Sequence, residues 1–117
     1  SNLIPIRASM VLRGRLMEHL CEAGLENELR REVSLCGIFS QLDLLLGEPL
    51  GAAIHRLPLS GRITSAIAGQ TGPYADWLAV ASALESSNTR MIREVCKAHK
   101  IPQDTVNRAL LRTLAAL

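Results

Sequence analysis

The chain has 117 residues, of which 48% are hydrophobic but only 3% aromatic, and its formal net charge is +2. This length favours a single domain over residues 1–117, large enough to bury a hydrophobic core. Twenty leucines and 14 alanines, against one Phe, one Tyr and one Trp, favour helices over a β-sandwich or barrel. No apolar run approaches the ~20 residues of a membrane helix. The small net charge gives no strong electrostatic affinity for nucleic acid or membrane.

Glycines and apolar periodicity divide the first part of the chain into two predicted helices. The first covers residues 8–23 and stops at Gly24, with an apolar face at helical spacing. The second, over residues 28–46, is the longest and ends at Gly47. Its apolar residues recur every three or four positions: Leu35, Ile38, Phe39, Leu42 and Leu46. Because two further leucines widen that face, we expect this helix to be central and buried on most sides.

Prolines and small polar caps mark shorter helices further along the chain. Pro49 opens a helix to about residue 56, Ser60 is the predicted N-cap of a helix to residue 68, and Pro73 opens one to about residue 85. The inward face of this last helix is predicted to carry four residues at helical spacing: Tyr74, Leu78, Ala81 and Leu84.

Residues 88–117 are predicted to form a terminal helical hairpin. Asn88 caps a helix over 89–99, and a helix over 102–116 follows a tight turn at Lys100, Ile101 and Pro102. No stretch alternates apolar and polar residues for long enough to be a strand. We therefore expect an all-α, compact multi-helix bundle of about six to seven helices.

The residue types that usually carry catalysis or bind metals are scattered rather than clustered. His19, His55 and His99 fall on three separate predicted helices, and no HExxH, HxH or GxSxG motif occurs. Cys96 with His99 is only a two-ligand pair, too few for a zinc site. The sequence therefore predicts no catalytic residue, no bound metal and no cofactor.

Three cysteines, Cys21, Cys36 and Cys96, have no paired spacing and leave an odd thiol. That pattern fits a reducing cytoplasm. Two pairs of glutamates lie four residues apart, Glu18 with Glu22 and Glu28 with Glu32. We interpret them as solvated helix surface near arginines.

The C-terminal helix pair suggests an alternative function. Residues 90–113 are similar to a helix-turn-helix DNA reader, whose second helix would place polar side chains in the major groove. Those side chains are Gln103, Asp104, Thr105, Asn107 and Arg108. However, Lys100 occupies the turn position at which a helix-turn-helix usually has a glycine that allows the bend. The bulky His99 occupies a position at which a small residue usually lets the two helices pack closely. A hairpin is also how helical bundles turn, so DNA binding is kept as the alternative.

The central stretch of the chain carries three motifs in succession. Residues 37–50 read GIFSQLDLLLGEPL, residues 57–60 read LPLS, and residues 72–78 begin a helix with GPYADWL. With the upstream segment LRGRLMEHL, they resemble the C-terminal part of the HDOD domain of bacterial EAL–HDOD proteins, an all-helical output domain related to HD phosphohydrolases. The resemblance runs from about residue 8 to the C-terminus and is firmest over residues 35–85.

This resemblance implies an HD-domain-like bundle with a degenerate metal site. Catalytic HD enzymes carry a metal-binding His on the earlier helix and a His-Asp pair on the later one. Gly14 stands at the first of these positions, and Ser40 and Gln41 stand at the pair. Because these three residues are poor or absent ligands, the resemblance implies that no metal is held. Ser40 and Gln41 are then expected to be interior polar residues that are hydrogen-bonded.

The resemblance also implies a partner. A full HDOD domain is longer, and its N-terminal helices and an EAL domain would precede this chain. We therefore expect a non-catalytic signal-transduction and protein-interaction domain linked to cyclic di-GMP signalling. Apolar helix faces left uncovered would bind another protein, the missing N-terminal portion or a second copy. No membrane partner is expected, and nucleic acid only under the alternative.

Overall fold

The computed structural model describes residues 3–21, 27–86 and 88–117, which form eight helices and no strand. In chain order the helices are α1 (Leu3–Leu20), α2 (Asn27–Phe39), α3 (Leu42–Leu46), α4 (Leu50–His55), α5 (Gly61–Gly69), α6 (Ala75–Ala83), α7 (Thr89–Ala98) and α8 (Gln103–Ala115). The all-α class is confirmed. None of these helices is both long and apolar enough to cross a membrane.

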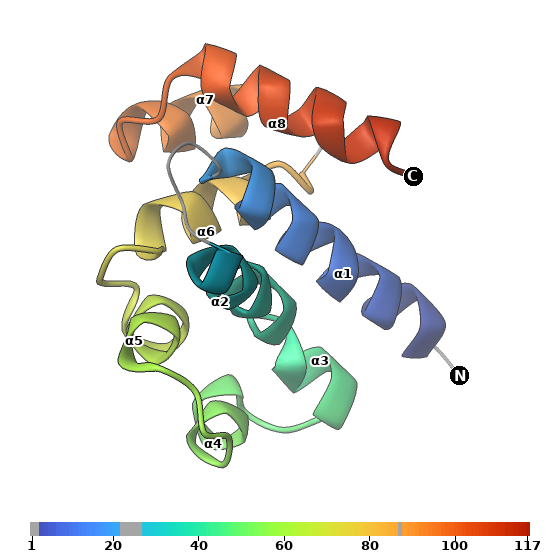
Figure 1. Ribbon diagram of the computed structural model, residues 1–117, viewed down its shortest axis with the longest axis vertical. Coiled ribbons are helices and arrows are strands. Elements are labelled where there is room, and N and C mark those ends of the chain that lie inside the picture. Colours follow the sequence, from blue (N-terminus) through green and yellow to red (C-terminus); the bar gives the residue numbers. More distant parts are fainter. Residues whose placement is uncertain (1–2, 22–26, 87) are drawn as a thin grey trace.

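The helix α2 lies in the middle of the molecule, and α1 packs beside it along one side (Figure 1). Helix α8 packs on α1, α6 contacts both α1 and α7, and α5 lies against α2. The short helices α3 and α4 connect α2 to α5. The largest fully buried side chains come from several of these helices and include Met17, Val33, Ile54, Val80 and Val106. One core therefore joins residues from both ends of the chain.

Two glycines bring the backbones of α1 and α2 into direct contact. A Cβ atom on Gly37 would lie 2.7 Å from the carbonyl oxygen of Arg13 and 2.8 Å from the Cα of Gly14. A Cβ atom on Gly14 would in turn lie 2.9 Å from the carbonyl oxygen of Ser34. Real Cβ atoms do not approach other atoms this closely, so any other residue at these positions would force the two helices apart.

The sequence predicted one continuous helix over residues 28–46, but the structure has two helices there, α2 and α3. This difference brings the number of helices to eight. In a continuous α-helix, the carbonyl of Gly37 would accept the backbone N–H of Gln41. Here the hydroxyl of Ser40 donates to that carbonyl instead, at 2.7 Å, and the chain turns before α3. Side chains of serine compete with the helix backbone in this way.

The expectation that this segment is buried on most sides is also wrong. Leu35 is 39% exposed, Leu44 54% and Leu46 48%. The turn at Ser40 changes the direction of the chain, so Leu44 and Leu46 after it face solvent, whereas Leu42 is buried in the core. The buried face of α2 is formed by Val33, Cys36 and Gly37.

Most helix ends lie close to their predicted positions. Ser60 caps α5 by accepting the N–H of Ile63 at 3.3 Å, and Asn88 caps α7 by accepting that of Met91 at 3.1 Å. The main difference is α1, which begins at Leu3 rather than at residue 8. Pro5 is tolerated there because the first turn of a helix needs no backbone N–H at that position. The predicted stop at Gly24 lies outside the described residues.

Candidate functional site

A hydrogen-bonded polar cluster lies where α1, the end of α2 and the end of α6 meet. Arg13 of α1 donates from Nε to Glu85 Oε2 at 2.8 Å, and its Nη2 forms an ion pair with the same oxygen. Its Nη1 donates to Ser40 Oγ at 3.0 Å. The side chains of Arg13 and Glu85 are only 12% and 22% exposed, so this ion pair is largely shielded from solvent.

A second pair of polar residues extends the cluster. The hydroxyl of Ser9 lies 3.0 Å from Glu85 Oε1 and 3.1 Å from the side-chain oxygen of Gln41. Because a hydroxyl has one proton, Ser9 donates to one of these acceptors at a time. Ser40 and Gln41 are half-buried rather than fully interior, and both are hydrogen-bonded.

The three positions predicted to have lost metal ligands belong to this region. Gly14 is buried against α2 with no room for a side chain, while Ser40 contacts the guanidinium of Arg13. Within the described part of the chain, no three His, Cys, Asp or Glu residues gather in a way that could hold a metal ion. Arg13 and Glu85 were not singled out from the sequence, because only the fold brings them together.

A cavity of about 340 Å³ opens beside this cluster. Arg13 and Ser40 line one part of it, and residues from α4, α5, α6 and the end of α7 line the rest. Its other polar side chains are Gln70, Ser82 and His99. The cavity therefore combines apolar helix faces with several hydrogen-bonding groups, which is the usual make-up of a small-molecule site.

Glu32 is the centre of a different network, on α2. Its Oε1 accepts from Ser60 Oγ at 3.0 Å, from Arg62 Nε at 2.6 Å and from Tyr74 OH at 3.0 Å, and its Oε2 accepts from Arg62 Nη2 at 2.9 Å. The hydrogen bonds from Arg62, and then those from Ser60 and Tyr74, lower the pKa of Glu32 to about 2. The interpretation of Glu32 as solvated surface is therefore wrong, since it ties α2 to α5 and α6.

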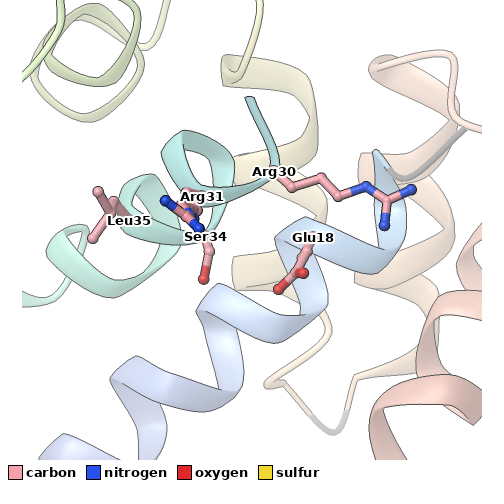
Figure 2. Close-up of a pocket in the computed structure, with 5 residues that line it drawn as sticks. All are labelled: Glu18, Arg30, Arg31, Ser34 and Leu35. Atoms are coloured by element: carbon pink, nitrogen blue, oxygen red, sulfur yellow. The ribbon is translucent and has the colours of Figure 1, made fainter. Parts of the chain in front are cut away.

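The groove between α1 and α2 is larger, at about 490 Å³, but is lined by only five residues (Figure 2). Figure 2 shows Glu18 and Ser34 facing one another across it, whereas Leu35 points away and Arg30 extends past α1. Arg31 adds a second positive charge at its edge. The lining combines one carboxylate with two guanidinium groups, so the groove has the character of a charged helix surface.

The histidines and cysteines are dispersed, as predicted. His55 Nδ1 lies 2.5 Å from the carbonyl of Gly51, and His99 pairs with Asp76 at 2.7 Å rather than with Cys96. All three cysteines are buried free thiols. Burial raises the pKa of Cys36 to about 12 and also raises those of Cys21 and Cys96, which favours the protonated thiol over the reactive thiolate.

The residues of the alternative DNA-binding function lie at the start of α8. Gln103, Asp104, Asn107 and Arg108 are exposed, whereas Thr105 is half-buried. Several of them bond to one another: Gln103 donates to Asn107 at 3.1 Å, and Arg108 Nε donates to the backbone of Asp104 at 3.4 Å.

The two terminal helices attach to different parts of the core. Helix α7 packs mainly on α6, and α8 packs mainly on α1. The two helices of the predicted hairpin therefore make their main contacts with other helices rather than with each other. Lys100 makes the turn in the left-handed conformation, with φ of 57°, although it is not a glycine.

Comparisons with protein-family models, with curated proteins and with solved structures found no match for this chain. A functional conclusion therefore depends on the chain's own residues and geometry.

Proposed function

We propose that this chain is a cytoplasmic, non-catalytic signal-transduction and protein-interaction domain. It is similar to the C-terminal part of the HDOD domain of bacterial EAL–HDOD proteins, an HD-domain-like bundle linked to cyclic di-GMP signalling. The observation that carries the proposal is an exposed apolar groove between α1 and the C-terminus. The cluster around Arg13 supports the proposal that the domain is not catalytic. The three buried free thiols support the proposal that it is in a reducing compartment.

The groove has a volume of about 440 Å³ and is lined mainly by α1. Three of its apolar residues are far more exposed than the core: Ile4 at 77%, Val11 at 48% and Leu117 at 82%. On α8, Leu111 and Leu114 are 67% and 59% exposed and lie three residues apart, so they share one helix face. Exposed apolar surface of this kind is typical of a protein-binding face.

Charge favours one kind of occupant. Arg7 and Arg15 line the groove and have no carboxylate partner in the described ranges. A second copy docked here about a two-fold axis would bring four guanidinium groups together, which is unfavourable. We therefore assign the groove to an amphipathic helix with an apolar stripe flanked by Asp or Glu. In an HDOD-like protein, such a helix would come from the N-terminal portion.

The polar cluster supports a domain without metal-dependent catalysis. The guanidinium of Arg13 contacts Ser40, one of the residues that stands at an HD ligand position. A divalent cation placed there would meet a fixed positive charge and no replacement ligands from Gly14.

The DNA-binding alternative has less support from the same surfaces. The first turn of α8 carries the carboxylate of Asp104, which phosphate groups would repel. Further along, the exposed surface of α8 presents Leu111 and Leu114, although Arg108 and Arg112 are exposed beside them. A protein partner fits this face better than a nucleic acid.

The test uses a labelled helical peptide of about 20 residues, with leucines on one face and glutamates beside them. We expect it to bind the 117-residue chain in a fluorescence anisotropy titration. A peptide with lysines in place of glutamates should bind at least about tenfold more weakly. Val11→Glu should abolish binding, whereas Leu44→Glu, at a comparably exposed leucine outside the groove, should leave it unchanged.

Sedimentation velocity over a range of concentrations checks the choice of occupant. We expect a monomer, since the arginines oppose self-docking. A dimer that Val11→Glu dissociates would assign the groove to a second copy instead. No binding of the glutamate peptide, or equal losses from Val11→Glu and Leu44→Glu, would overturn the proposed interaction face.

A further inference from the structure

The cavity of about 340 Å³ beside Arg13 lies apart from the groove proposed above, and none of its lining residues is shared with it. Its apolar wall includes Leu50, Ile67 and Leu78, from three different helices. The volume is at the lower end of the roughly 300–1,000 Å³ that is usual for small-molecule sites. A ligand here would be small and partly apolar.

Several hydrogen-bonding groups at the cavity are not used by the protein. An arginine side chain has five N–H bonds, and three of those on Arg13 go to Glu85 and Ser40. The two others have no partner in the described residues. The hydroxyl of Ser82 and the amide of Gln70 also make no hydrogen bond there. Both donors and acceptors are therefore available to a ligand.

The charges around the cavity are already balanced. The positive charge of Arg13 is matched by Glu85, and His99 is paired with Asp76 at 2.7 Å. An anionic ligand would find no unpaired cation, and a cationic ligand would find no unpaired carboxylate. Moving either kind of charge out of water without a partner is costly. A neutral molecule avoids this cost and can still use the free donors and acceptors.

We infer that this cavity binds a small uncharged amide, with its carbonyl oxygen accepting from Arg13 and its apolar body against Ile67 and Leu78. The amide N–H groups would donate to Ser82 Oγ or to the side-chain oxygen of Gln70. The site is a binding site only, since it presents no nucleophile and base in contact. It is independent of the proposed protein interaction, and either can fail without the other.

Benzamide and benzoate provide a matched pair of probes, because they have nearly the same shape and differ in charge. The full chain is titrated with each while the backbone amide resonances are followed by NMR. We expect benzamide to cause saturable shifts at Ile67, Ala79 and Ser82. Benzoate should bind at least about tenfold more weakly. Equal or tighter binding of benzoate would overturn the uncharged class, and no saturable shift with benzamide would overturn the site.

Variants locate the binding. Ala79→Leu fills the cavity and should abolish the benzamide shifts, whereas Ala68→Leu, at an exposed alanine of α5, should leave them unchanged. Should Ala79→Leu unfold the chain, Ser82→Leu at an exposed lining residue blocks the same space with less risk to the core. Shifts that persist in a folded cavity-filling variant would place benzamide elsewhere and overturn the assignment.

Discussion

Arg13 and Glu85 lie 72 residues apart in the chain, and Nε and Nη2 of Arg13 both donate to Oε2 of Glu85. This ion pair connects the middle of α1 to the segment that follows α6. Through Ser40, Arg13 also holds the turn between α2 and α3. Ser40, at one of the positions that the resemblance predicts to have lost a metal ligand, is therefore part of a structural contact.

Arg13→Met should lower the free energy of unfolding by about 2 kcal/mol, because it leaves the carboxylate of Glu85 shielded from water without its main partner. Arg56→Met is the control, since Arg56 is 61% exposed in its pair with Glu48. That loss should stay below about 1 kcal/mol. Urea denaturation measures both. Similar losses for the two variants would show that the shielded pair contributes no more than a surface pair.

Gly37→Ala should destabilise the fold by about 2 kcal/mol or more, because its Cβ would overlap the backbone of α1 at Gly14. The matched control is Gly51→Ala in α4, where a Cβ meets nothing within 4 Å. That change should stabilise the fold by about 0.5–1 kcal/mol, since alanine favours helix. Thermal and urea unfolding give both values. A neutral Gly37→Ala would contradict the close approach of the helices.

Acid should weaken the fold through Glu32. Its pKa is about 4.5 in the unfolded chain and about 2 in the folded protein, so its stabilisation is complete above pH 4.5 and is lost as the pH falls towards 2. The contribution is on the order of 1 kcal/mol, because Arg62 is half exposed and solvent screens the pair.

Urea unfolding between pH 6 and pH 2.5 measures this dependence. Glu32→Gln should lower stability near pH 6 and flatten the decline towards acid. Glu28→Gln, at an exposed position of the same helix, should keep the decline of the parent chain. An unchanged slope in Glu32→Gln would rule out this carboxylate as the source.

The cysteines should be unreactive in the folded protein. Because burial raises their pKa values, to about 12 for Cys36, almost no thiolate is present at pH 8. A thiol reagent such as Ellman's should react slowly with the native chain and rapidly with all three cysteines in guanidinium chloride. A thiol that reacts rapidly in the native state would contradict its buried position.

The chain should not bind DNA specifically. Fluorescence anisotropy with a labelled duplex at low salt should give no saturable binding, and Arg108→Ala should change nothing. Any weak binding should be lost with added salt and show no preference for sequence. Salt-dependent binding that Arg108→Ala weakens would instead favour the alternative function of α8.

Much of the helix pattern could be predicted from the sequence, because its signals are local. Ser60 and Asn88 cap the N–H groups three residues later, and Pro49 precedes α4. The break at Ser40 is local too, but apolar periodicity conceals it. A hydroxyl that competes for the carbonyl of Gly37 leaves no mark on the spacing of the leucines around it.

The site was less predictable because its contacts are long-range. Glu32 looked like one of two like charges on an exposed face, yet its partners lie 28 to 42 residues later. Leu35 and Leu46 follow the apolar pattern but are exposed, since burial depends on which helix packs against which face. Which residues pair and which helix faces are buried therefore depend on contacts between distant parts of the chain.

By itself, the sequence determined that this protein is all-α, where most of its helices end, and which residue types are scattered rather than clustered. Those properties depend on backbone preferences and on neighbours three or four residues away. Only the tertiary structure decided that Arg13 binds Glu85, that Gly14 meets Gly37, and that an apolar groove and a cavity beside Arg13 stay open. These depend on the angle and distance at which helices pack, which no local pattern specifies.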